Sequence, residues 1–103
     1  MRLSNVTVTE AERLYEAALE SYRDLFGPMD RAARSLWFLT MDEFEILSFP
    51  VLAGQDPQEA SVRHGVKLAA MADALESLPD HEEWVHEAND LRRIARQHGY
   101  LGR

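Results

Sequence analysis

The sequence predicts an all-α fold, a compact single domain spanning residues 1–103 and built from about five short amphipathic helices. Apolar residues recur at helical spacing along most of the chain, and signals for helix starts and helix ends alternate between them. A chain of 103 residues also has the usual size of one domain, and no internal repeat or linker divides it. The absence of cysteine excludes a disulfide framework, a thiolate metal site and a cysteine nucleophile.

The first predicted helix covers residues 10–26, and residues 1–8 alternate weakly enough to form a short edge strand or an extended arm. Thr9 and Glu12 have the spacing of a capping box. The apolar positions that follow share one face: Ala11, Leu14, Tyr15, Ala18, Leu19, Tyr22, Leu25 and Phe26. Gly27 and Pro28 should end the helix, since glycine can turn left-handed and proline cannot continue a helix.

Two shorter helices are predicted next, over residues 29–39 and 41–48. In the first of them we expect one apolar side to face the core, made of Met29, Ala32, Ala33, Leu36 and Leu39. Thr40 and Glu43 repeat the capping-box spacing and predict a turn before the second, although one bent helix is the alternative. Residues 48–55 should then form an apolar loop bounded by Pro50 and Gly54.

The fourth predicted helix, over residues 57–78, should be the central one. Asp56 is a favoured N-cap and Pro57 suits the first helical position. One apolar row consists of Ala60, His64, Leu68, Met71, Leu75 and Leu78, and a second, nearly opposite row consists of Val62, Val66 and Ala69. A helix that is apolar on two sides is usually packed on both.

The fifth predicted helix covers residues 81–98. Pro79 separates it from the fourth, and Asp80 with Glu83 has the spacing that caps a helix start. Its expected inner face is Trp84, Ala88, Leu91, Ile94 and Ala95. Gly99 should end it.

The charge balance bears on partners and location. The chain has 18 acidic and 11 basic residues, a net charge of −7. An acidic protein does not suit the phosphate backbone, so we expect no direct binding of nucleic acid. The longest apolar stretch, residues 36–53, contains Asp42, Glu43 and Glu45, which argues against a membrane span. We expect a cytoplasmic protein without membrane contact.

The sequence contains no convincing catalytic, cofactor or metal site. His81 and His86 are five residues apart, which on a helix turns them roughly 140° from each other, so they cannot chelate one ion as a His-Glu-x-x-His motif does. Glu83 and His86 match a di-iron spacing that requires a second copy, which is missing. His64 reads better as a histidine at the core edge, hydrogen-bonded to backbone, than as a catalytic residue. We expect no enzymatic activity, no cofactor and no bound metal.

An apolar surplus between Leu36 and Ala53 suggests a binding surface. One helical face cannot bury all of these large side chains, and Phe38 falls on the side of Arg31 and Arg34. The candidate partner-binding patch consists of Phe38, Ile46, Phe49, Val51 and Leu52. Burial of the whole segment by neighbouring helices is an equally good interpretation.

A second candidate surface is the acidic face of the first helix, formed by Glu12, Glu16, Glu20 and Asp24, which could combine with the acids between residues 82 and 90. Such a face could imitate a phosphate backbone, although a simply solvated polar face explains it better.

These surfaces lead to three functional expectations. The leading one is a non-catalytic interaction module, a small adaptor, regulator or inhibitor that binds another protein through the apolar patch. The first alternative is an acidic nucleic-acid mimic of mobile-element type, an anti-CRISPR-like protein or nuclease inhibitor that blocks a DNA- or RNA-binding protein. The second is a homo-oligomeric structural subunit that uses the apolar patch on itself.

Overall fold

Four α-helices make up most of the structure, a computed structural model that describes residues 2–3, 6–41, 54 and 56–100. They are α1 (Val8–Phe26), α2 (Arg31–Met41), α3 (Pro57–Glu76) and α4 (Val85–Gln97), and a short 3-10 helix, η2 (His81–Trp84), leads into α4. At the N-terminus β1 (Arg2–Leu3) pairs antiparallel with β2 (Val6–Thr7). The predicted all-α class and the short extended arm are confirmed. Within the described residues no helix combines the length and the apolar run that crossing a membrane requires.

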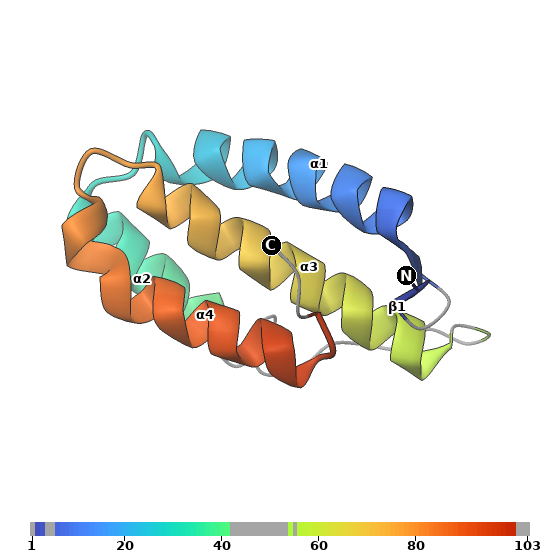
Figure 1. The fold of residues 1–103 in the computed structure, drawn as a ribbon. Helices are drawn as coiled ribbons and strands as arrows, with labels where there is room; N and C mark the ends of the chain where they lie inside the picture. The colour runs from blue at the N-terminus through green and yellow to red at the C-terminus, as the bar shows by residue number, and fades with distance from the viewer. Residues whose placement is uncertain (1, 4–5, 42–53, 55, 101–103) are drawn as a thin grey trace.

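Helix α3 is the central element, as its two apolar rows predict. It lies between α1 and α4 (Figure 1) and packs closely on both. One side contributes Leu68, Met71 and Leu75 to a first core cluster, and the other contributes Val62 and Val66 to a second. The fold therefore has two adjoining cores that share one helix.

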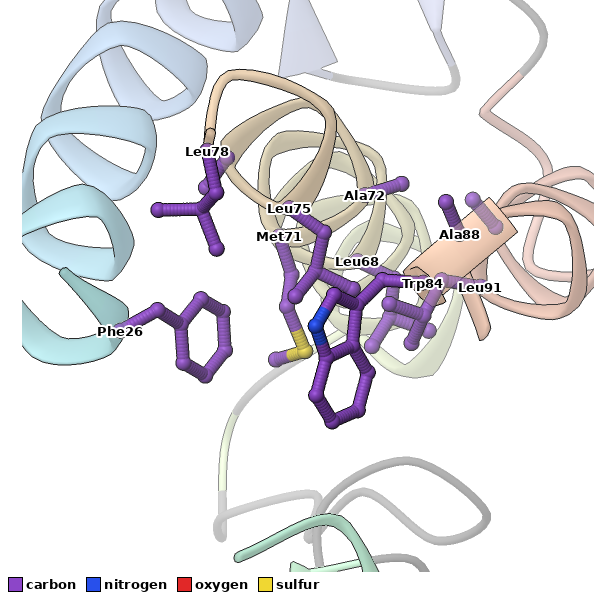
Figure 2. Packing of buried hydrophobic residues seen from close by; sticks show 11 residues of the cluster. Phe26, Leu68, Met71, Ala72, Leu75, Leu78, Trp84, Ala88 and Leu91 are labelled. Atoms are coloured by element: carbon purple, nitrogen blue, oxygen red, sulfur yellow. The ribbon is translucent and has the colours of Figure 1, made fainter. Parts of the chain in front are cut away.

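The first core, called here the tryptophan cluster, lies where α3 ends and α4 begins. Its buried residues are Phe26, Leu68, Met71, Ala72, Ala74, Leu75, Leu78, Trp84, Ala88, Leu91 and Ala95. Figure 2 shows Phe26 of α1 and Trp84 of η2 gathered around Met71 and Leu75 of α3. Trp37 and Phe38 of α2 pack against the same cluster.

The second core, called here the tyrosine cluster, joins the N-terminal hairpin, α1, α3 and the residues after α4. It consists of Val6, Ala11, Tyr15, Ala18, Val62, Val66, Ala70 and Tyr100. Since Val6 belongs to β2 and Tyr100 follows α4, both ends of the described chain are anchored here.

The helix ends agree with the sequence at some points and correct it at others. Asp56 caps α3 as predicted, because its Oδ1 accepts a hydrogen bond of 2.9 Å from the Gln58 amide. Helix α1 instead starts earlier, with Thr7 accepting from the Glu10 amide at 3.1 Å. Gly27 is right-handed, with φ of −53°, so its predicted left-handed turn is wrong and Pro28 alone stops the helix.

The predicted fifth helix is divided in two. Residues 81–84 form η2, and α4 begins only at Val85. Asp80 makes no capping hydrogen bond, because its carboxylate accepts from Arg34 and Trp84 instead. The predicted end is confirmed, since Gly99 has a left-handed φ of 93° two residues after α4.

The orientation of α2 reverses the prediction. Ala32, Ala33, Leu36 and Leu39, expected to face the core, are all exposed, and Arg34, Trp37 and Phe38 turn inward. The rings of Trp37 and Phe38 pack against the tryptophan cluster instead, and Arg34 finds partners for its guanidinium. The predicted helix over residues 41–48 and most of the loop over 48–55 lie outside the described residues.

Candidate partner-binding face of α2

Helix α2 begins at a defined cap and is fixed by one buried cation. The Oδ1 of Asp30 accepts a hydrogen bond of 2.8 Å from the Ala33 amide, which starts the helix at Arg31. Arg34 is only 4% exposed. Its Nε donates to the Phe26 carbonyl at 3.1 Å, and its Nη1 lies 2.5 Å from Oδ2 of Asp80. One guanidinium thus ties α2 to the end of α1 and to the start of η2.

The partner of Arg34 is itself held in place. The Trp84 indole Nε1 donates to the same Asp80 Oδ2 at 3.2 Å, and the Arg34 guanidinium carbon lies 5.7 Å from the Trp84 ring centre. Burial alone would raise the pKa of the Asp80 carboxyl, but the hydrogen bonds from Trp84 and Arg34 outweigh it and keep that pKa below its ordinary value. Asp80 therefore carries its charge at neutral pH.

Four aromatic rings complete the inner face of α2. The Trp37 ring meets the rings of Phe26 and Phe38 edge-on, each at 5.1 Å between centroids. Phe38 also stacks on Phe26 at 5.6 Å and lies 6.0 Å from Trp84. Phe38 is consequently partly buried against the tryptophan cluster on the inner side of α2, and its expected role as a partner contact stays a prediction. Arg34 shares its side of the helix as predicted, but that side faces inward.

The outer face of α2 presents the two most exposed large apolar side chains in the described chain. Leu36 is 65% exposed and Leu39 is 76% exposed. Residues three apart on a helix lie side by side, and Ala32, four residues before Leu36, extends the row by one turn. We call Ala32, Leu36 and Leu39 the α2 face. The sequence revealed this row, but its direction was predicted wrongly.

The other four members of the predicted apolar patch, Ile46, Phe49, Val51 and Leu52, lie outside the described residues. Their expected role as partner contacts therefore stays a prediction.

The acidic face of α1 is present as a row on the surface. Glu12, Glu16, Glu20 and Asp24 are all exposed, and none of them forms an ion pair with another described residue. Helix α3 lies between this helix and α4 (Figure 1), so the acids near the start of α4 belong to a different side of the bundle. The expected combination of the two acidic stretches stays a prediction.

A polar network that the sequence did not reveal connects α1, α3 and α4. The Tyr15 hydroxyl donates to Asp73, and Arg92 binds both Asp73 and Glu76. The carboxylate of Glu76, followed by that of Asp73, raises the pKa of the Arg92 guanidinium despite partial burial. These partners are 58, 19 and 16 residues apart, so no local spacing could have paired them.

The histidines fall into exposed and half-buried types. His86 projects into solvent, with Nε2 3.3 Å from the Asp90 carboxylate. His64 is half-buried on α3, and its ring meets the ring of His98 at 4.9 Å and 80°. In the described part of the chain no three His, Asp or Glu side chains gather closely enough to hold a metal ion.

The α2 face offers apolar contact and no chemistry. Leucine and alanine side chains provide neither a nucleophile, an acid or base, nor a metal ligand. What the face can do is lose its hydration against a complementary surface. No protein-family model, curated protein sequence or solved structure matches this chain.

Proposed function

We propose that this protein is a non-catalytic interaction module that binds another protein through the α2 face. The single observation that carries the proposal is the exposure of Leu36 and Leu39 on a helix whose opposite side packs against the tryptophan cluster. Burying a leucine stabilises a complex by roughly 1.5–3 kcal/mol, so two adjacent leucines are a substantial binding contribution. An adaptor, a regulator or a small inhibitor would fit this property.

The fixed orientation of α2 supports the proposal. If the helix could rotate about its axis, Leu36 and Leu39 could turn toward the core, and their exposure would not indicate a binding surface. Arg34 prevents that rotation, because its buried guanidinium would lose Asp80 and the Phe26 carbonyl. The α2 face is therefore already in its binding conformation, and little conformational entropy of α2 is lost when a partner binds.

The cellular setting of this proposal is the cytoplasm. A chain without cysteine needs no oxidising compartment to fold. The partner is then a cytoplasmic protein with an apolar groove or helix of its own.

The test compares three tagged proteins on lysate of the source cells, each washed at low and at high salt. In the variant Leu36→Ser/Leu39→Ser we expect loss of a protein that the wild type retains at high salt, because apolar contact is not screened by ions. Leu25→Ser is the matched control, since Leu25 is a partly exposed leucine on α1. All three should have the same helix content by circular dichroism. Equal capture by the double variant would refute the proposal.

Self-association is the outcome that would replace this proposal with the homo-oligomeric alternative. If the molar mass from light scattering rises with concentration for the wild type and not for Leu36→Ser/Leu39→Ser, the partner is a second copy and the protein is a homo-oligomeric subunit.

The acidic face of α1 supports a second candidate, a nucleic-acid mimic that occupies the groove of a DNA- or RNA-binding protein. Successive acids four residues apart repeat about every 6 Å along the helix axis and lack ion-pair partners among the described residues. This function predicts a captured protein that is released by high salt and by the variant Glu12→Gln/Glu16→Gln/Glu20→Gln. Capture that resists both would count against it.

A further inference from the structure

The residues that follow α4 fold back onto α3 and are fastened there. We call residues 98–100 the C-terminal turn. Gly99 takes a left-handed conformation, and the Tyr100 amide donates to the Ala95 carbonyl at 3.1 Å. The Tyr100 side chain then enters the tyrosine cluster beside Val6, Val62 and Val66. The turn therefore closes one end of that core.

The contact between this turn and α3 is unusually close. A Cβ placed on Gly65 would lie 2.9 Å from the Ala95 carbonyl oxygen and 3.0 Å from the Tyr100 Cβ. At this point the backbone of α3 lies directly against the last turn of α4, and the side chains of Tyr100 and His98 begin beside it. A contact of this kind depends on the side chains around it to hold the two segments together.

Two histidines and a serine surround the contact. The Ser61 hydroxyl donates to the His98 carbonyl at 3.1 Å and lies 2.9 Å from His98 Nδ1. On its other side the His98 ring meets the half-buried ring of His64, from the next turn of α3, at 4.9 Å. The turn is thus held to α3 by the Ser61 hydroxyl and by the contact between the two imidazole rings.

Charge on this pair would work against the docking. Two imidazolium rings at this separation repel each other, and partial burial strengthens the repulsion. Burial lowers the pKa of His98, even though the end of a helix favours a cation. The neutral form of His98 is therefore the form that fits the docked turn.

The surrounding elements carry charged groups of both signs. Arg63 and Lys67 of α3 lie on either side of His64 in the sequence, and Arg96 of α4 precedes His98 by two residues. The carboxylates of Glu10 on α1 and Glu59 on α3 lie 3.5 and 3.6 Å from Arg63. Arg63 is thus paired with two carboxylates, and the described charges around the histidine pair are of both signs.

We propose that His64 and His98 form an acid-sensitive latch, whose protonation releases the C-terminal turn from α3 and uncovers the tyrosine cluster around Val62 and Val66. At neutral pH the latch is closed. Because the folded pKa of His98 is lowered, the stability that the neutral form contributes is complete above the unfolded pKa of about 6.5 and decreases as the pH falls below it. The inference is independent of the α2 face.

The test is hydrogen exchange by NMR on the full chain, expressed as protection factors so that the intrinsic pH dependence of exchange is removed. Between about pH 7.5 and about pH 5 we expect the protection factor of the Tyr100 amide to fall by about tenfold or more, because the turn opens when the histidine pair becomes charged. Amides of the tryptophan cluster, such as that of Leu75, should keep theirs.

Variants identify the groups responsible. In His64→Gln/His98→Gln the selective loss at Tyr100 should disappear, and in the control His86→Asn, which alters an exposed histidine of α4, it should remain. If the double variant fails to fold, His64→Gln alone should reduce the loss. The latch is overturned if Tyr100 stays protected at acid pH, if Leu75 loses protection equally, or if the histidine variants behave as wild type.

Discussion

The two cores of this protein are built on opposite principles, although both use α3. In the tryptophan cluster large rings from three other segments pack around leucine and methionine, with aromatic centroids 5.1 to 6.4 Å apart. In the tyrosine cluster alanine and valine dominate, and a glycine lets two backbones touch. The tryptophan cluster holds its elements together by filling the space between them with large side chains. The tyrosine cluster does so by bringing the backbones of its elements close together.

This difference explains which surfaces each core leaves available. The rings beneath α2 fix the rotation of that helix, and its outer row of Ala32, Leu36 and Leu39 is presented as a consequence. Tyr100 is the large side chain that the C-terminal turn buries. The rest of the contact between the turn and α3 depends on polar side chains at its edge. The size of the buried side chains therefore accounts for both proposals, the rigid α2 face over the tryptophan cluster and the releasable C-terminal turn over the tyrosine cluster.

The largest expected effect comes from emptying the ring-packed core. Phe26→Ala removes a fully buried ring that contacts Tyr22, Trp37 and Phe38. We expect a loss of about 3–5 kcal/mol in the free energy of unfolding, since the surrounding rings cannot collapse into the cavity. Urea unfolding followed by tryptophan fluorescence measures it, because both tryptophans belong to this core.

The neighbouring residue supplies the control for that measurement. Leu25→Ala changes an exposed side chain on the same turn of α1, and should cost less than about 1 kcal/mol. Similar losses in the two variants would mean that Phe26 does not organise the cluster and that α2 is held by Arg34 alone.

An intermediate effect should come from filling the close contact in the other core. Gly65→Ala gains helix propensity but places a methyl group against the Ala95 carbonyl and Tyr100. We expect the steric term to prevail and to destabilise the protein by about 1–3 kcal/mol. Thermal unfolding of this variant, compared with Lys67→Ala at an exposed site on the same helix, measures the cost. An increase in stability would show that the turn is held more loosely than the structure has it.

The helices were predictable from the sequence because their signals are local. The caps at Asp56 and Gly99 and the two apolar rows of α3 depend only on neighbouring positions, so the central helix was located correctly. The start of α1 moved by two residues because Thr7 and Thr9 are equally good caps, and the pairing of β2 with β1 extends the chain up to Thr7.

What the sequence could not reveal depends on partners distant in the chain. The rotation of α2 was decided by Asp80, 46 residues after Arg34, and by the rings of Phe26 and Trp84. The contact of His64 with His98 likewise joins α3 to the turn that follows α4. An apolar row in the sequence indicates that a helix has an apolar face, but the neighbouring elements determine whether that face is turned toward the core.

The smallest expected effect tests the link between the two cores. Tyr15 belongs to the tyrosine cluster, yet its hydroxyl donates to Asp73, which Arg92 binds from α4. Tyr15→Phe keeps the ring and removes the hydroxyl that makes this hydrogen bond, so we expect a loss of about 1 kcal/mol in the free energy of unfolding. A double-mutant cycle with Asp73→Asn isolates the coupling energy between the two side chains. A coupling energy near zero would mean that the hydrogen bond between Tyr15 and Asp73 does not link the two cores. A coupling energy about as large as the single loss would mean that Asp73 transmits the position of α1 to α4, so that the two cores respond as one unit.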